Sequence, residues 1–221
     1  MFFDYGEKEL DYLKAKDKRL GDLIDQVGYL EIPVDKDVFS SVVRHIIGQQ
    51  ISMAAQNTIW ERLKEKLGKV SPEKILELTR EELQSVGITF KKADYILNFA
   101  QKVSKRAFPI EALHEMTDEE VIEELCKIDG IGPWTAEMIM TFSMGRSDIV
   151  SFGDLAILRG MRKLYRHRKI DKETFGKYRR RYSPYGSIAS FYLWELAEGD
   201  FPHITDPGER KRKNKKKDSN R

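Results

Sequence analysis

The chain has 221 residues, of which 40% are hydrophobic and 10% aromatic, and this composition excludes a wholly disordered polymer. The length suits one large domain or two small ones. Its single cysteine excludes an internal disulfide framework and a four-thiolate zinc or iron–sulfur site built by this chain alone, and favours a reducing compartment. No apolar run approaches the roughly 18 residues that span a bilayer, and the N-terminus lacks the basic start and apolar stretch of a secretory signal.

The net charge of +3 is unevenly distributed along the chain. The tail Glu209–Arg221 carries eight basic and two acidic residues, a charge of +6, which leaves the preceding body at −3. Within that body, Arg159–Arg181 holds eleven basic and two acidic residues, a charge of +9. Two basic segments on a mildly acidic body favour contact with a polyanion such as nucleic acid. A solvated helix face and a solubilising tail would have the same composition.

Hydrophobic residues recur at helical spacing and no alternating strand pattern appears, so we predict an all-α fold. Two capping boxes, Thr79 with Glu82 and Thr117 with Glu120, mark helix starts because each supplies partners to unbonded backbone amides. We predict helices over residues 38–50, 52–67, 91–105, 121–125, 133–142, 154–165, 171–181 and 187–198, and a basic disordered tail at 209–221.

The segment Leu125–Thr135 is the most informative part of the sequence. Gly130-Ile131-Gly132 turns the chain, and Pro133 suits the first turn of the next helix. Two glycines permit positive φ and remove side chains that would block close approach. The amides at the start of the following helix, at the positive end of its dipole, then suit a phosphate. A tight turn with glycine as a helix cap would also have this pattern.

This segment resembles the helix-hairpin-helix of the DNA glycosylase superfamily that carries this motif, here at 121–142. Two further segments agree, because His45–Ser52 resembles the family's DNA-facing loop and Gly87–Ile96 resembles its small loop leading into a helix. Gly153-Asp154 falls where the family keeps its catalytic Asp.

The details resemble the alkylpurine branch of that family, typified by DNA-3-methyladenine glycosylase II. Arg159-Gly160 and Tyr185–Trp194 carry this part of the resemblance, which covers roughly residues 20–203. It implies two helical subdomains flanking a cleft. We expect residues 1–37 with 150–208 to form one subdomain and residues 38–149 the other.

The resemblance implies that Asp154 is the catalytic residue. Breaking an N-glycosidic bond builds positive charge on the deoxyribose, and a carboxylate at ~4 Å stabilises it by about 4 kcal/mol at an effective dielectric near 20. The same group can orient or deprotonate the attacking water. An Asp directly before Leu155–Leu158 is also an ordinary helix N-cap, and the two roles can coexist.

Five residues are implied to contact DNA. Glycosylases extract a base from the duplex, which requires a grip on the backbone and a plug for the vacated space. The resemblance assigns the grip to the hairpin amides around Gly130, Gly132 and Thr135. It assigns the plug, or the contact with the orphaned base, to Gln49 and Gln50, which also read as a polar helix terminus.

Aromatic residues are the candidates for the base pocket. Alkylation at purine N3 or N7 leaves a formal positive charge, which cation–π attraction to an aromatic face favours. The candidates are Trp134, Tyr29 and Phe39, although aromatic residues at the last two positions also suit a hydrophobic core. Relatives that nick the strand use a Lys just after the hairpin turn. Pro133-Trp134 stands there instead, which predicts a monofunctional enzyme that attacks with water.

No cofactor is expected, and in particular no iron–sulfur cluster. The resemblance implies a structural Na⁺ or K⁺ ion at the hairpin, held by the main-chain carbonyls of Cys126, Ile128 and Ile131. Cys126 is then expected to be a small buried residue and not a nucleophile, since no activating His lies nearby in the sequence.

The function expected from these features is hydrolysis of the N-glycosidic bond of alkylated purines of the 3-methyladenine type, flipped out of duplex DNA in base excision repair. The partner is double-stranded DNA with a damaged base, with no membrane, and the chain is expected to act as a monomer in the nucleoid or cytoplasm of a prokaryote or the nucleus of a eukaryote. Two alternatives remain: a helix-hairpin-helix protein that binds DNA without catalysis, and a glycosylase for oxidised or deaminated bases.

Overall fold

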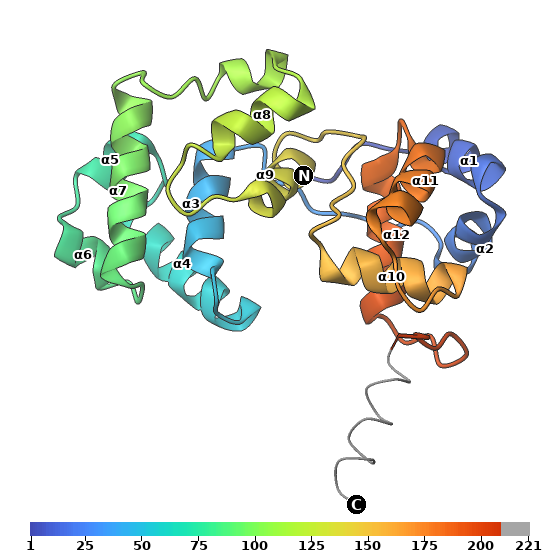
Figure 1. The fold of residues 1–221 in the computed structure, drawn as a ribbon. Coiled ribbons are helices and arrows are strands. Elements are labelled where there is room, and N and C mark those ends of the chain that lie inside the picture. The colour runs from blue at the N-terminus through green and yellow to red at the C-terminus, as the bar shows by residue number, and fades with distance from the viewer. Residues whose placement is uncertain (209–221) are drawn as a thin grey trace, which may run out of the picture. The chain divides into compact units, whose positions relative to one another are not determined.

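The computed structural model describes residues 1–208, so the tail predicted at 209–221 lies outside the described residues. Within them the regular structure is helical, apart from one isolated bridge between Phe2 and Pro33, and this confirms the all-α prediction (Figure 1). No helix in the described part of the chain combines the length and the apolarity that a bilayer crossing requires.

The chain divides into two compact units. One contains Met1–Val34 together with the chain from Gly145 onward, and the other is Asp35–Met144. The divisions fall a few residues before the expected ones at 37/38 and 149/150.

The unit Asp35–Met144 is built around α3, which packs against α4, α7 and α9 (Figure 1). Ile46 and Ile47 of α3 are fully buried, and Phe99 of α7 is only 1% exposed. The elements of this unit are α3 (Val38–Gly48), α4 (Met53–Leu67), α5 (Pro72–Leu76), α6 (Arg80–Gln84), α7 (Phe90–Ser104), the 3-10 helix η1 (Ala112–Glu115), α8 (Asp118–Leu125) and α9 (Pro133–Phe142).

The other unit is organised by the crossing of α10 and α12 (Figure 1). A Cβ at Gly160 of α10 would lie 2.2 Å from the carbonyl oxygen of Leu193 in α12, so only glycine allows the two backbones to approach this closely. The elements are α1 (Glu7–Lys16), α2 (Lys18–Val27), α10 (Leu155–Tyr165), α11 (Lys172–Tyr182) and α12 (Gly186–Glu198).

Local signals in the sequence explain most helix starts. Both predicted capping boxes form, with Thr79 and Thr117 each accepting from the third amide of the helix and the Glu at that position accepting in return. Pro133 is the first residue of α9, as predicted. The helix predicted over 38–50 ends earlier, at Gly48, because Gln49 leaves the helical conformation with ψ 129°, and Gln50 after it has a positive φ of 58°.

Candidate functional site

The turn between α8 and α9 uses its two glycines in different ways. Gly130 has φ +85°, and a Cβ there would lie 2.8 Å from the ring of Tyr95. Both the conformation and the packing therefore require glycine. Gly132 is extended, with φ −108°, and a Cβ there would meet nothing within 4 Å. Only Gly130 adopts the positive φ that both glycines permit, whereas the missing side chain of Gly132 leaves open space at the start of α9.

The start of α9 has the features of an anion site. Gly132 is the N-cap residue without a side-chain cap, and Pro133 at the first position has no N–H of its own. The remaining first-turn amides lie at the positive end of the helix dipole and have no acceptor within the helix. Thr135 is 8% exposed in this turn. Because a Cβ at Gly132 would meet nothing within 4 Å, the space beside Gly132 at the start of this turn is open.

A groove of about 1050 Å³ lies in the unit Asp35–Met144 and connects the hairpin with the end of α3. It brings together four of the five residues predicted to contact DNA, along with the predicted pocket residue Trp134. Its lining consists of His45, Gly48, Gln49, Gln50, Ile51, Gln56, Thr89, Lys91, Lys92, Tyr95, Gly130, Trp134 and Thr135.

Gln49 and Lys92 join the two sides of this groove. The Gln49 side-chain amide donates to the carbonyl oxygen of Gly130 at 2.6 Å. Lys92 Nζ donates to the carbonyl oxygens of Ile47 and Gln49 at 2.9 and 2.7 Å, and so binds the C-terminal end of α3. Burial lowers the pKa of Lys92 from its ordinary value. No sequence pattern could have identified this role of Lys92, because its acceptors are main-chain carbonyls.

Gln50 is the more exposed of the two glutamines. Its left-handed backbone turns the chain outward between α3 and α4. The next residue, Ile51, is 37% exposed, and Met53 at the start of α4 is 77% exposed. Apolar and amide side chains thus stand together on the loop that the sequence predicts to face DNA. Gln49, by contrast, is tied to the hairpin and shapes the groove.

His45 of α3 lines the same groove and is held in one orientation, because its Nδ1 lies 2.8 Å from the carbonyl oxygen of Ser41. Burial lowers the pKa of His45, the bond to Ser41 opposes this effect, and the nearby charge of Arg44 lowers the pKa further. The folded state therefore favours neutral His45.

We expect His45 to destabilise the fold as pH falls. A folded pKa below the unfolded value of about 6.5 means that the unfolded chain binds the extra proton first, so stability present above pH ~6.5 is lost below it. His45→Gln should flatten the dependence of the melting temperature on pH between 7.5 and 5. His203→Gln is the control, since His203 is exposed and should leave the dependence unchanged. Equal slopes for wild type and His45→Gln would contradict this assignment.

The three carbonyls predicted to hold a cation belong to the turn itself. The Ile128 carbonyl oxygen accepts from the amide of Ile131 at 3.0 Å, which leaves its second lone pair for another partner. Neutral carbonyl oxygens are hard ligands, a type that suits alkali cations. Within residues 1–208, no cluster of three or more His, Cys, Asp or Glu side chains could hold a metal ion.

Cys126 is partly exposed, so the expectation that it is buried is wrong. It follows the last turn of α8, and its side chain does not reach the core as Leu125 does. Desolvation and the nearby charge of Glu137 raise the pKa of the thiol above its ordinary value. The thiol is therefore protonated at neutral pH, which opposes a nucleophilic role.

Asp154 lies in the unit that contains α10, and its side chain caps that helix. Its Oδ1 accepts from the amides of Ala156 and Ile157 at 2.8 and 3.0 Å. The residue is 7% exposed, although Leu155 beside it is 76% exposed. The prediction that Asp154 is a helix N-cap is thus confirmed. A carboxylate that caps a helix through two backbone amides is held in one orientation.

The loop that leads to Asp154 is fixed by residues that sequence reasoning missed. Asp148 accepts from Arg179 at 3.0 and 3.1 Å, from the Ser183 hydroxyl at 2.7 Å and from the amide of Gly186 at 3.0 Å. The Ser187 hydroxyl accepts from the amide of Ile149 and donates to the carbonyl oxygen of Arg146.

These bonds attach the loop to the start of α12, and therefore set where α10 begins. Ser151, also in this loop, is fully buried. Its hydroxyl is one of two buried side-chain polar atoms without a hydrogen-bond partner in the described residues.

The three candidate pocket residues have different surroundings. Trp134 is 47% exposed in the groove. Tyr29 is 55% exposed in the unit that contains Asp154, and its ring stacks on Tyr5 with centroids 4.8 Å apart. Phe39 is 5% exposed and stacks on Phe99 at 5.1 Å in the core of α3 and α7. Phe39 is therefore placed as a core residue and does not line the groove.

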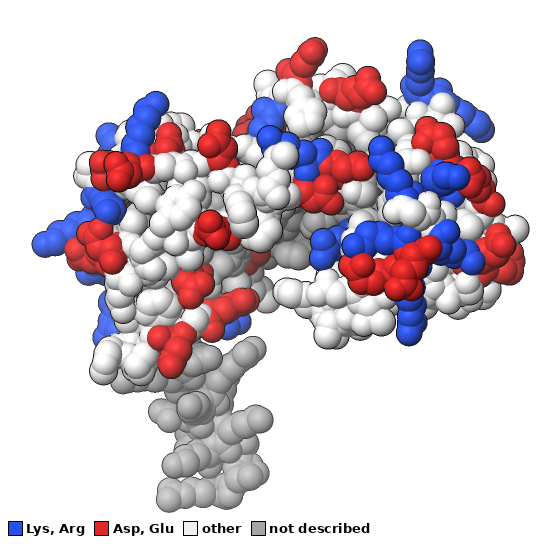
Figure 2. Space-filling model, turned by 180° about the vertical axis from the view of Figure 1, so that it is seen from behind, with Lys and Arg blue, Asp and Glu red and all other residues white. Residues whose placement is uncertain are grey.

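The basic run Arg159–Arg181 does not form one uniform patch. Arg162, Arg179 and Arg181 form ion pairs with Asp206, Asp148 and Asp17 respectively. Lys163 donates to two carbonyls at the end of α12. On the face that Figure 2 shows, acidic and basic side chains are interspersed. A large part of the charge in this run therefore holds the unit together, which the one-dimensional charge count could not show.

Comparison with known proteins places these features in a family. Residues 43–184 match the family model described as HhH-GPD superfamily base excision DNA repair protein. The relative YfjP of Bacillus subtilis is 28% identical over 75% of this chain, which spans 61% of that protein's length.

Two solved structures have a similar fold. A DNA-3-methyladenine glycosidase from Bacillus halodurans is 31% identical, with a TM-score of 0.81 over 96% of this chain and 98% of that one. The 3-methyladenine DNA glycosylase of Schizosaccharomyces pombe, solved with abasic DNA, is 28% identical, with a TM-score of 0.71 over 85% of this chain and 95% of that one. The family predicted from the sequence is confirmed, and the chain belongs to the HhH-GPD superfamily of base excision DNA repair proteins.

Proposed function

We propose that this chain is a monofunctional DNA glycosylase that hydrolyses the N-glycosidic bond of alkylated purines flipped out of duplex DNA. The observation that carries the proposal is Asp154, a buried and capped carboxylate at the start of α10. The names of the similar proteins from Bacillus halodurans and Schizosaccharomyces pombe support 3-methyladenine as the type of lesion.

In this mechanism Asp154 acts on the sugar. As the bond to the purine breaks, the deoxyribose becomes an oxocarbenium-like cation, and the ionised carboxylate stabilises that charge. The two amides that bind Oδ1 keep the carboxylate in place, so that little reorganisation is needed during the reaction. The same carboxylate orients water for attack on the sugar carbon and accepts its proton. The electron pair of the broken bond leaves with the base.

The leaving group needs no protein acid when the purine is alkylated at N3 or N7. Such a base carries a positive charge and departs as a neutral molecule once it takes the bonding electrons. Aromatic faces attract the cationic base before it leaves. Tyr29, whose ring stacks on Tyr5, and the exposed indole of Trp134 are the candidates for this role.

The hairpin unit supplies the DNA contacts in this proposal. The amides after Gly132, including that of Thr135, bind a backbone phosphate, and the open space at Gly132 admits it. Gln50, exposed on its left-handed turn, fills the space that the extruded base leaves, and Gln49 supports the hairpin through Gly130. Since no lysine follows the turn, no Schiff base forms there and the strand stays intact.

We also propose that the carbonyls of Cys126, Ile128 and Ile131 would hold Na⁺ or K⁺, which would stabilise the turn and add positive charge to the hairpin. Replacing these ions with choline at constant ionic strength should then weaken DNA binding. Unchanged affinity would contradict the cation site. The chain acts as a monomer on double-stranded DNA containing a damaged base, in the nucleoid or cytoplasm of a prokaryote or the nucleus of a eukaryote.

A panel of duplexes tests the lesion class. We expect release of free base from methylated duplex, with far less from matched duplexes that contain an oxidised purine or uracil. Preference for either of the latter would replace the alkylpurine assignment with a different glycosylase activity. Binding to all the duplexes with no base released from any would show a DNA-binding protein without catalysis.

A further inference from the structure

We propose that a second phosphate-binding site lies in the unit that contains Asp154, at the opposite end of α10. It is a pocket of about 480 Å³ between the junction of α1 and α2 and the C-terminal parts of α10 and α11. Its described lining contains one acidic residue, Asp17, and four Lys or Arg residues, of which Lys16, Lys18 and Arg19 surround Asp17 in the sequence.

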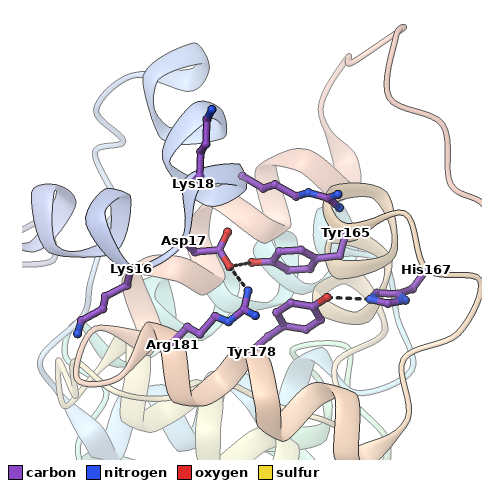
Figure 3. Close-up of a pocket in the computed structure, with 8 residues that line it drawn as sticks. Lys16, Asp17, Lys18, Tyr165, His167, Tyr178 and Arg181 are labelled. Atoms are coloured by element: carbon purple, nitrogen blue, oxygen red, sulfur yellow. Dashed lines mark hydrogen bonds and ion pairs between the residues drawn. The ribbon is translucent and has the colours of Figure 1, made fainter.

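Asp17, the acidic residue of this pocket, already has hydrogen-bond and ion-pair partners, and these offset its repulsion of an anion. Asp17 is 5% exposed, and its Oδ1 accepts from the amide of Leu20 to cap α2. Its Oδ2 accepts from the Tyr165 hydroxyl at 3.0 Å and from Arg181 at 2.9 Å (Figure 3). The positive charge of Arg181 thus neutralises the Asp17 carboxylate, and the Arg181 side chain remains partly exposed.

Arg181 can bind a further partner besides Asp17. Its bond to Asp17 uses one terminal nitrogen, whereas a guanidinium has five N–H donors, and its side chain is 44% exposed. The guanidinium carbon lies 5.1 Å from the centre of the Tyr178 ring. That ring stacks on Tyr165 at 3.7 Å and bonds to His167 through its hydroxyl at 2.7 Å. Figure 3 shows this wall of two facing rings beside Arg181. A guanidinium held in one orientation offers parallel N–H donors, and therefore recognises phosphate more specifically than a point charge such as a Lys ammonium does.

The three other cations add to this field. Lys16, Lys18 and Arg19 are all exposed, and the last two lie in the first turn of α2, which Asp17 already caps. The combination of an oriented Arg181 and three exposed cations in one pocket suits a phosphate group.

The site is separate from the proposed catalytic position. Asp154 caps the first turn of α10 and Tyr165 ends that helix, so eleven residues at 1.5 Å each separate them by about 17 Å. DNA rises about 3.4 Å per base pair, so a backbone phosphate held here would lie several nucleotides from the flipped base. A phosphate on a small molecule has the same chemistry, and the experiment separates the two sources.

The test compares two triple variants of the full chain with equal charge loss. The pocket variant is Lys16→Gln, Lys18→Gln and Arg19→Gln, which leaves the Asp17–Arg181 pair intact. The control is Lys8→Gln, Lys172→Gln and Lys177→Gln, three exposed lysines of the same unit that do not line the pocket. Affinity for an abasic duplex is measured against KCl concentration, and inorganic phosphate is titrated into each protein at constant ionic strength while the tyrosine NMR signals are followed.

If the source is DNA, the salt slope of the pocket variant should fall by about 1 more than that of the control, since one phosphate contact releases about one counterion. If the source is a small molecule, inorganic phosphate should shift the Tyr178 signals in wild type and control but not in the pocket variant, with equal DNA slopes for both variants. Equal slopes together with no phosphate-dependent shift would overturn the proposal. Neither readout uses base release, so the result is independent of whether the glycosylase proposal stands.

Discussion

Asp154→Asn is expected to lower the rate of methylpurine release by about three orders of magnitude, with abasic-duplex affinity and thermal stability close to wild type. The loss follows from removing one ionised carboxylate at ~4 Å from a sugar cation, worth about 4 kcal/mol at an effective dielectric near 20. The fold is preserved because Asn is as good an N-cap as Asp, and its side-chain oxygen can accept from Ala156 and Ile157 in the same way. Single-turnover base release measures the effect.

The matched control is Asp171→Asn. Asp171 caps α11 by accepting from Thr174 at 2.9 Å, so it shares the capping role of Asp154 but has no part in the proposed reaction. We expect no change in base release for this variant. A similar fall in both variants would mean that the loss comes from altered helix starts, and undiminished release by Asp154→Asn would remove the catalytic role.

Gly132→Leu is the second large effect that we expect, and it acts on binding. The extended backbone and the open space around Gly132 allow a side chain, so the protein should fold with a cost of at most about 1 kcal/mol for the poorer N-cap. The new side chain would occupy the path of the phosphate toward the first-turn amides. Losing one charge-assisted hydrogen bond costs about 1.5–3 kcal/mol, so DNA affinity should fall tenfold to a hundredfold.

Gly6→Leu is the corresponding control, measured by the same duplex titration and thermal melt. Gly6 is also an extended glycine N-cap, before α1, and a Cβ there would meet only Glu9 at 4.0 Å. It belongs to the other unit and does not begin the helix that follows the hairpin turn, so DNA affinity should not change. If Gly132→Leu binds DNA as tightly as Gly6→Leu does, the hairpin amides do not hold a phosphate.

The sequence predicted those features that depend on local chemistry. The capping boxes at Thr79 and Thr117 and the proline at the start of α9 act within one helical turn, and all three form as predicted. The family resemblance rested on a turn whose residues are adjacent in the chain, and it is confirmed. The helices α5 and α6 have five residues each, which is too short for a periodic pattern to define.

Features that depend on contacts between residues far apart in the sequence could not be predicted from local patterns. Gly130 and Gly132 look alike in sequence, and only the position of the Tyr95 ring separates a required glycine from an open one. The role of Asp148 could not be predicted from the sequence, because its partners Arg179, Ser183 and Gly186 lie more than thirty positions later in the chain. The ion pairs that divide the basic run are likewise made by acids outside it.

The most direct test of the central claim is a count of two products from one methylated duplex, made with wild type and with Asp154→Asn. The proposed hydrolysis predicts that wild type releases methylpurine and alkali-labile abasic sites in equal amounts, with the strand intact before alkali. Asp154→Asn should still bind abasic DNA and form neither product at a comparable rate. Strand breaks without alkali, or equal product formation by the variant, would contradict hydrolysis directed by the Asp154 carboxylate.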